Sequence, residues 1–322
     1  MSRSRTRILF DTDPGIDDAM ALLMLARDAR AELVGISTVF GNAPVDVTTA
    51  NALALCHRFG IDVPVARGAA WPMARAPRPF PVEIHGHDGL GDVAPHPPHD
   101  RLPEPADAAR FIVDMAHRHG GGLTLVAVGP LTNLAQALAL DPELPRHVQR
   151  VVVMGGAFGT HGHAGNVTPV AEANVHCDPH AAGVVFGAAW SVTVVGLDVT
   201  HQVLMSSAYL DALGHDGGVE GRYLRDITRT YERFYHRRTG GGIYAHDASA
   251  VACALDPSRF QVQHGALYVV TEGVAMGQTL QSPRGLQFPA GDRVGAPEQQ
   301  ACVAVDAAGV LADFRACLVG YG

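Results

Sequence analysis

The 322-residue sequence predicts an α/β fold, a mostly parallel central sheet flanked by helices on both faces. Three observations lead to this prediction. Short apolar segments alternate with segments of helical periodicity, and no repeat, long linker or low-complexity tract interrupts the series. The composition is 47% hydrophobic and 17% charged, which suits a large buried core. We expect a single domain over residues 1–322.

The elements follow in order along the chain. In the first predicted helix, Ala19, Leu22, Leu23 and Ala26 obey the i, i+3, i+4, i+7 rule. The predicted strands are 7–10, 33–39, 63–66, 123–128, 151–154 and 192–195. The predicted helices are 17–28, 45–59, 106–119, 131–140 and 179–187. Residues 67–104 are predicted to be a long functional loop, and 155–169 a second loop rich in glycine and histidine.

The remaining part of the chain continues the pattern less regularly. A helical region is predicted over 206–238, and a glycine-rich turn follows over 239–247. A helix then extends to Leu255, with strands near 261–271 and 301–305. Ligands of such folds bind beyond the carboxyl ends of the strands. We therefore expect the polar clusters that follow the strands to line one rim: residues 11–18, 41–42, 129, 155–174 and Asp198.

Charge and cysteine content exclude several classes of function. The net charge is −8, and an acidic chain is repelled by phosphate backbones, so we expect no nucleic-acid partner. No C-x-x-C pair occurs among the cysteines, so neither a disulfide framework nor a structural zinc site is indicated. No apolar run is long enough for a membrane span or a signal peptide, and we expect a cytoplasmic protein without membrane contact.

Four aspartates lie within eight residues at the end of the first predicted strand: Asp11, Asp13, Asp17 and Asp18. Carboxylates this close repel one another and raise each other's pKa, unless a cation lies among them. Carboxylate and carbonyl oxygens are suited to calcium or magnesium. The alternative is that Asp17 merely caps the following helix while the others are solvated loop residues.

A phosphatase is the chemical rival. Asp11-Thr12-Asp13 resembles the D-x-D motif of haloacid-dehalogenase-like phosphatases, in which the first aspartate attacks phosphate. Those enzymes also need a downstream lysine, and this sequence contains none. The absence of lysine argues against this function.

A set of motifs, in order along nearly the whole chain, resembles the inosine/uridine-preferring nucleoside hydrolases, which are calcium-dependent nucleoside N-ribohydrolases. The first motif is the segment from Asp11 to Ala19, DTDPGIDDA. The others are TVFGN at 38–42, VGPLTN at 128–133, MGG at 154–156, Asn166 with AEAN at 171–174, DP at 178–179, GLDVT at 196–200 and HD at 246–247. Each short motif is weak alone, but together they are specific.

The resemblance implies a role for each matching residue. The Ca²⁺ ligands would be Asp13, Asp18, Asp247 and the carbonyl oxygen of Val128. Asp13 would also activate a Ca²⁺-bound water, and His246 would protonate the leaving base. The ribose would be held by Asp17, Asn42, Asn166, Glu172 and Asn174, with Asp11 as a supporting carboxylate behind them. Relatives are commonly homodimers or homotetramers.

The chemistry of the residues agrees with hydrolysis of ribonucleosides to ribose and free base, as in nucleoside salvage. Cleavage of a glycosidic bond passes through a positively charged, oxocarbenium-like sugar, which carboxylates stabilise. A site that binds the 2′-hydroxyl should reject 2′-deoxyribonucleosides. The alternative from another class is a Ca²⁺-dependent ribose- or nucleoside-binding protein without turnover.

Several aromatic residues are left with open roles. His85 and His87 have the spacing of a zinc-binding pair without an evident third ligand, and we favour His85 as a lid or nucleobase contact. Tyr231, Tyr235 and Tyr244 either stack on the base or pack within the protein. His161 and His163, in the second long loop, receive no role.

Overall fold

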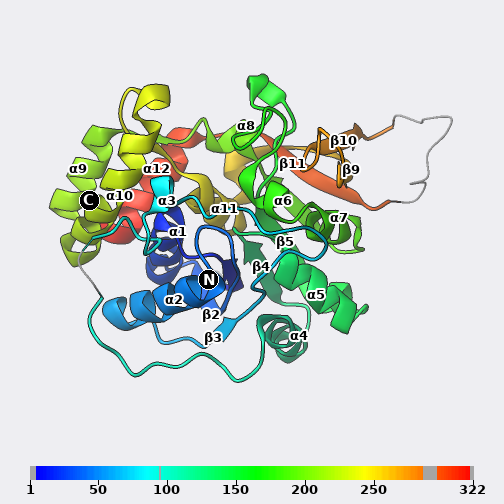
Figure 1. The fold of residues 1–322 in the computed structure, drawn as a ribbon, viewed down its shortest axis with the longest axis horizontal. Coiled ribbons are helices and arrows are strands. Elements are labelled where there is room, and N and C mark those ends of the chain that lie inside the picture. Colours follow the sequence, from blue (N-terminus) through cyan, green and yellow to red (C-terminus); the bar gives the residue numbers. More distant parts are fainter. Residues whose placement is uncertain (1–4, 94–95, 286–295, 320–322) are drawn as a thin grey trace.

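The computed structural model describes residues 5–93, 96–285 and 296–319, and it confirms the α/β fold (Figure 1). Within this part of the chain, nine strands form one sheet in the order β10-β9-β11-β6-β5-β4-β1-β2-β3. The strands are β1 (Thr6–Thr12), β2 (Ala31–Thr38), β3 (Val65–Arg67), β4 (Leu123–Ala127), β5 (Val148–Met154), β6 (Val192–Val195), β9 (Phe260–Val269), β10 (Thr279–Pro283) and β11 (Glu298–Val305). Neighbours from β11 to β3 are parallel, whereas β9 is antiparallel to both β11 and β10.

Helices connect the strands. They are α1 (Ile16–Arg27), α2 (Val45–Phe59), α3 (Val82–His85), α4 (Ala108–His119), α5 (Thr132–Leu140), α6 (Ala173–Cys177), α7 (Pro179–Gly187), α8 (Leu197–Thr200), α9 (Ser207–Asp216), α10 (Gly218–Thr239), α11 (His246–Leu255) and α12 (Ala307–Val319). A small second sheet pairs β7 (Leu204–Met205) with β8 (Ile243–Tyr244). In Figure 1 the β9–β10 hairpin lies at one end of the molecule, and α9 and α10 lie at the other.

The sheet separates two hydrophobic cores because successive side chains of a strand point to opposite faces. Ile8 and Phe10 of β1 join one core, and Leu9 between them joins the other. The first core also takes side chains from α1, α2, α10, α11 and α12. The second takes side chains from α4, α5 and α7. Strands that are buried on both faces account for the continuous apolar runs in the sequence.

The predicted elements of the first two-thirds of the chain are confirmed, with shifts of a few residues at their ends. The predicted helical region 206–238 is in fact two helices, because Gly217 ends α9 and α10 begins at the next residue. Residues 243–244 form β8 within the predicted turn 239–247. The strand β10 and the helix α12 were not predicted. The long loop 67–104 contains one short helix, α3, which carries His85.

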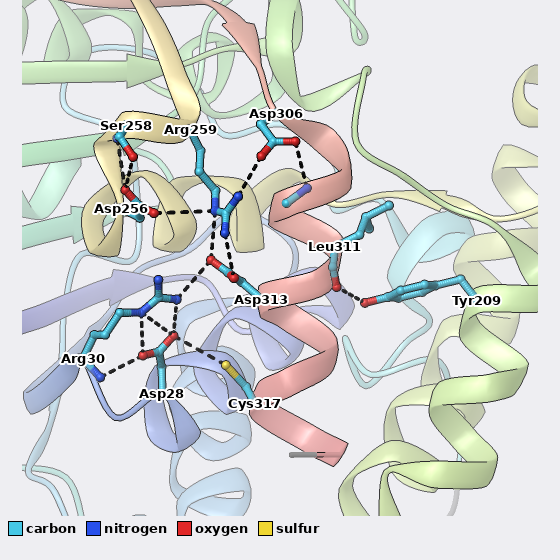
Figure 2. A network of polar contacts seen from close by, with 11 residues as sticks. Asp28, Arg30, Tyr209, Asp256, Ser258, Arg259, Asp306, Leu311, Asp313 and Cys317 are labelled. Carbon is cyan, nitrogen blue, oxygen red and sulfur yellow. Dashed lines mark hydrogen bonds and ion pairs between the residues drawn. The ribbon is translucent and has the colours of Figure 1, made fainter. Parts of the chain in front are cut away.

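A polar network joins α12 to the rest of the fold (Figure 2). Asp313 of α12 accepts hydrogen bonds from Arg259 and from Arg30, and Arg30 also binds Asp28. Asp28 follows α1 and Arg30 precedes β2, so the network links the C-terminal helix to the first βα unit. Among the described residues, no helix is both long and apolar enough to cross a membrane.

Candidate active site

One pocket lies beyond the carboxyl ends of β1, β2, β4 and β5, as the fold predicts. Its volume is about 980 Å³, part of which is open to solvent. Most of the predicted site residues line it: Asp13, Asp17, Asn42, His85, Val128, Asn166, Glu172, Asn174, His246 and Asp247. These residues come from segments far apart in the sequence, and only the parallel sheet brings them to one edge.

Asp13 is fixed in place by its neighbours at the floor of the pocket. Its Oδ2 accepts a hydrogen bond of 2.8 Å from the backbone N–H of Asn42. Two glycines pack directly against its carboxylate. A Cβ atom would lie 2.0 Å from Oδ2 if added at Gly41, and 2.5 Å from Oδ1 if added at Gly129. Only glycine fits at these two positions, which explains the G-N and G-P parts of the motifs.

Asp18 is held from several sides and also caps α1. Its Oδ1 accepts hydrogen bonds from the Thr12 hydroxyl at 2.5 Å and from the Asp13 N–H at 3.1 Å. Its Oδ2 accepts from the Gly15 N–H and the Asn42 side-chain amide, both at 2.9 Å. Asp18 does not itself line the pocket, but it lies directly below Asp13. The N-cap of α1 is Gly15, so Asp17 is not the cap.

Asp17, Asp18 and Asp247 form the acidic centre of the site. A carboxylate oxygen of each lies within 4.8 Å of the others, and this is the sole group of possible metal ligands among the described residues. Burial, together with the charge of Asp18, raises the pKa of Asp17 to about 7. Burial and the charges of Asp17 and Asp18 hold the pKa of Asp247 well above its usual range. Such repulsion marks a place where a cation would be stabilised.

The structure brings the predicted metal ligands together but groups them differently. Asp13 lies outside the compact trio, although burial and the charge of Asp18 raise its pKa well above normal. The Val128 carbonyl oxygen faces the same pocket and accepts a 2.7 Å hydrogen bond from the Asn174 amide. No His85–His87 metal group occurs in the described residues.

The donor set fits a hard divalent cation. Asp13 Oδ1 and Asp17 Oδ1 are buried and find no hydrogen-bond partner in the part of the chain that the structure describes. Unpartnered buried carboxylate oxygens are costly unless positive charge lies beside them. All the available ligand atoms are oxygens, which suits calcium or magnesium better than zinc.

Asp11 lies behind the pocket, as predicted. It is fully buried and does not line the cavity. Its Oδ1 accepts hydrogen bonds from Ser37 at 2.5 Å and from Asn133 at 2.8 Å. Burial raises the pKa of Asp11 to about 7, although both hydrogen bonds oppose the shift. Asp11 is therefore a second buried carboxylate layer beneath Asp13.

Asn166, Glu172 and Asn174 form the wall opposite the acidic centre. Glu172 caps the short helix α6, accepting from the N–H groups of Asn174 and Val175, and it also binds the Gly156 N–H. The Asn166 Oδ1 is buried without a partner among the described residues. A polar atom left free in a pocket is available to a ligand. Asp198 departs from the expected rim, because it binds the Phe158 N–H below the pocket.

Histidines and tyrosines line the remaining side. His246 Nδ1 lies 2.8 Å from the Thr200 hydroxyl, and its Nε2 lies 3.2 Å from the Tyr235 hydroxyl. Burial lowers the pKa of His246 well below its usual value. Burial also lowers the pKa of His85 to about 3, and His85 Nδ1 accepts from the Ile16 N–H at 3.2 Å. Both imidazoles are therefore neutral here, each with one N–H to donate.

Several pocket residues were missed by the sequence analysis. They belong to the segment before α3 and to the end of α10, and they are Arg78, Phe80, Ile84, Phe234 and Arg238. The loop residues follow no metal or catalytic motif. Their only signal was an Arg-Pro-Phe-Pro run within a loop already predicted to be functional. Of the three tyrosines considered, Tyr231 and Tyr235 line the pocket, and Tyr244 does not.

Comparison with known proteins gives consistent matches over the whole fold. The sequence model of the inosine-uridine preferring nucleoside hydrolases matches residues 8–312. Uridine nucleosidase 1 of Arabidopsis thaliana is 38% identical over 318 residues, which cover 97% of this chain and 93% of the relative. The non-specific ribonucleoside hydrolase RihC of Escherichia coli is 38% identical, over 84% of this chain and 85% of its own.

Solved structures agree. A plant nucleoside hydrolase, the PpNRh1 enzyme, superposes with a TM-score of 0.91 at 32% identity, covering 98% of this chain and 99% of its own. A purine-preferring ribonucleoside hydrolase from Gardnerella vaginalis superposes with a TM-score of 0.89, also at 32% identity, covering 98% of each chain.

Proposed function

The chain belongs to the inosine-uridine preferring nucleoside hydrolase family of enzymes that act on N-glycosyl bonds, and from this premise we propose how its residues cleave a ribonucleoside. The observation that carries the proposal is the pocket itself. It combines unpartnered carboxylate oxygens on its floor, free amide groups on one wall and neutral histidines on the other. That distribution matches a polyhydroxylated sugar joined to a flat base.

The ribose binds over the acidic floor in this proposal. Asp17 and Asn42 accept or donate hydrogen bonds to its 2′- and 3′-hydroxyls, and Asn166, Glu172 and Asn174 hold the 5′-hydroxyl end. Asp13, Asp18, Asp247 and the Val128 carbonyl hold Ca²⁺. When bound, Ca²⁺ supplies positive charge that binds sugar hydroxyls and makes a neighbouring water easier to deprotonate.

Asp13 acts as the general base. Its Oδ2 is held by the Asn42 N–H, and its Oδ1 is free to accept a proton from the attacking water. General acid–base help of this kind contributes about 10²–10⁴-fold to a rate. The buried carboxylates near the sugar also stabilise the positive charge that develops as the C–N bond breaks.

The base leaves toward the histidine wall. If the Thr200 hydroxyl donates to His246 Nδ1, the single proton of the neutral ring lies on Nε2, on the side of Tyr235. From there it can be donated to the departing base. His85 lies 5.4 Å from the Tyr231 ring, centroid to centroid, and is placed to contact the base.

A nucleoside panel scored by ribose release tests the proposal, with uridine, inosine and 2′-deoxyuridine as the first substrates. We expect wild-type turnover of the ribonucleosides and a kcat/KM for deoxyuridine that is lower by about 10²-fold or more, because the hydroxyl-binding groups are left unpaired. Asp13→Asn should lower kcat by at least about 10²-fold. Asp46→Asn, at an exposed position, serves as the control.

Each outcome has a clear meaning. An active Asp13→Asn enzyme would contradict the mechanism, and equal kcat/KM for uridine and deoxyuridine would contradict the 2′-hydroxyl contact. Saturable nucleoside binding without ribose release would indicate the binding protein instead of the hydrolase. Release of phosphate from phosphomonoesters would restore the phosphatase.

A further inference from the structure

A row of aromatic rings leads from the second long loop to the pocket. His163 of that loop lies against His201, with 3.0 Å between the two Nδ1 atoms and 4.7 Å between the ring centroids. The His201 ring packs on Tyr244 at 4.5 Å and on His246 at 5.6 Å, centroid to centroid. Of these four residues only His246 lines the pocket.

His201 forms the back support of His246. It directly follows Thr200, whose hydroxyl binds His246 Nδ1, so two adjacent residues contact the same ring. Tyr244 packs on both His201 and His246 and closes the cluster on a third side. The His246 ring is therefore held from behind by α8 and β8, and its Nε2 is left toward Tyr235 and the pocket.

The His163 contact fixes His201 in turn. Two Nδ1 atoms at 3.0 Å require one ring to donate and the other to accept, so the contact selects the tautomer of each ring. His201 Nε2 is buried, and it has no hydrogen-bond partner in the described part of the chain. The hydrogen bond to His163 thus sets the position of a ring that is otherwise held by packing alone.

We propose that His201, held by His163, is a positioning residue for His246 and aims its N–H at the departing base. This inference rests on the proposed function. It gives a role to His163 in the long second loop, and it extends the apparatus for leaving-group departure beyond the residues that touch the substrate. A packing role alone would affect all substrates equally, whereas a positioning role affects only those whose leaving group needs a proton.

The test compares leaving groups. Uridine and inosine release bases that need protonation, whereas p-nitrophenyl β-D-ribofuranoside releases a stable anion that does not. His201→Ala should lower kcat on both nucleosides about 10- to 100-fold, a part of the full general-acid effect. Its KM should change less than about threefold, because the ribose contacts remain. Hydrolysis of the p-nitrophenyl riboside should stay within about threefold of wild type. His163→Ala, in the loop, should shift rates in the same pattern by a smaller factor.

His161→Ala is the matched control. It removes a histidine of the same loop whose Nε2 faces the Val303 carbonyl at 3.1 Å, away from His201, and it should leave all three substrates unchanged. Equal loss on nucleosides and on the p-nitrophenyl riboside in both the His201 and His163 variants would overturn the proposal, as would unchanged rates on all substrates. A wild-type enzyme that released ribose from no nucleoside would instead refute the proposed function. Melting temperatures of the variants identify any that fail to fold, and His163→Ala then decides alone.

Discussion

At the scale of single residues, the site depends on how closely the backbone approaches Asp13. Gly41 and Gly129 leave no room for a Cβ atom beside its carboxylate, and the Asn42 N–H lies 2.8 Å from Oδ2. A carboxylate clamped in this way keeps one orientation without the entropy loss of a freely rotating side chain. Precise placement of a reacting group is worth about 10²-fold in rate per ångström.

Gly129→Ala tests this clamp. The new methyl group would meet Asp13 Oδ1 at 2.5 Å and Val39 Cγ1 at 2.9 Å, so the carboxylate must move. We expect kcat/KM for ribonucleosides to fall by about 10²-fold. Gly183→Ala is the control, because its added Cβ meets no atom within 4 Å and lies within α7. That variant should keep full activity and gain up to about 1 kcal/mol of stability. Unchanged activity of Gly129→Ala would show that the clamp is not needed.

At the scale of elements, the network of Figure 2 fixes α12 to the first βα unit. Asp28 accepts from the Arg30 Nε at 2.9 Å and Nη2 at 2.6 Å, and Arg30 reaches Asp313 of α12 at 3.2 Å. Burial alone would raise the pKa of Asp28, but the hydrogen bonds and charge of Arg30 outweigh it, so the pKa is lowered. The ionised form of Asp28 thus stabilises the fold.

Asp28→Asn should lower the free energy of unfolding at pH 7 by about 1–3 kcal/mol, the value of hydrogen bonds to a charged group. A carboxyl whose pKa is lower in the folded state stabilises fully above its unfolded pKa of about 4, and that stabilisation is lost as the pH falls through the folded value. The difference between wild type and variant should therefore shrink below about pH 4. Urea titrations at several pH values measure it. Asp226→Asn, in an exposed pair with Arg229, should change stability by less than about 0.5 kcal/mol. A difference that stayed constant with pH would contradict this account.

At the scale of the whole molecule, the fold concentrates negative charge at one edge of its sheet. Burial raises the pKa values of Asp11, Asp13, Asp17, Asp18 and Asp247, and also that of Glu172. Six buried carboxyl groups around one site oppose folding when they are ionised together. A bound cation would offset that repulsion, and binding that favours the folded state raises its stability.

Addition of Ca²⁺ should therefore raise the melting temperature of the protein relative to a chelator-treated sample. Saturation at 100-fold above Kd corresponds to about 2.7 kcal/mol. Calorimetry with Ca²⁺, Mg²⁺ and chelator measures the effect, and Asp247→Asn should reduce it because one of the clustered carboxylates is lost. Identical melting temperatures with and without Ca²⁺ would exclude calcium as a ligand of the folded state.

Much of the fold could be predicted because it follows from local periodicity. The strands at 192–195 and the helix at 179–187 were predicted to the residue, since apolar runs and caps are local signals. The strand β10 and the helix α12 were missed, because their pairing partners lie outside the local window. The boundary between α9 and α10 at Gly217 was missed because helical periodicity continues on both sides of it.

The sequence by itself determined the fold class, the acidic segment from Asp11 to Asp18 and the order of the motifs. These depend on spacing along the chain, which the sequence contains. Only the tertiary structure decided that Asp17, rather than Asp13, shares the compact acidic trio with Asp18 and Asp247. It also brought Arg78 and Arg238 to the pocket and His201 behind His246. Contacts between residues tens to hundreds of positions apart depend on how the parallel strands align their ends, and no local pattern records that alignment.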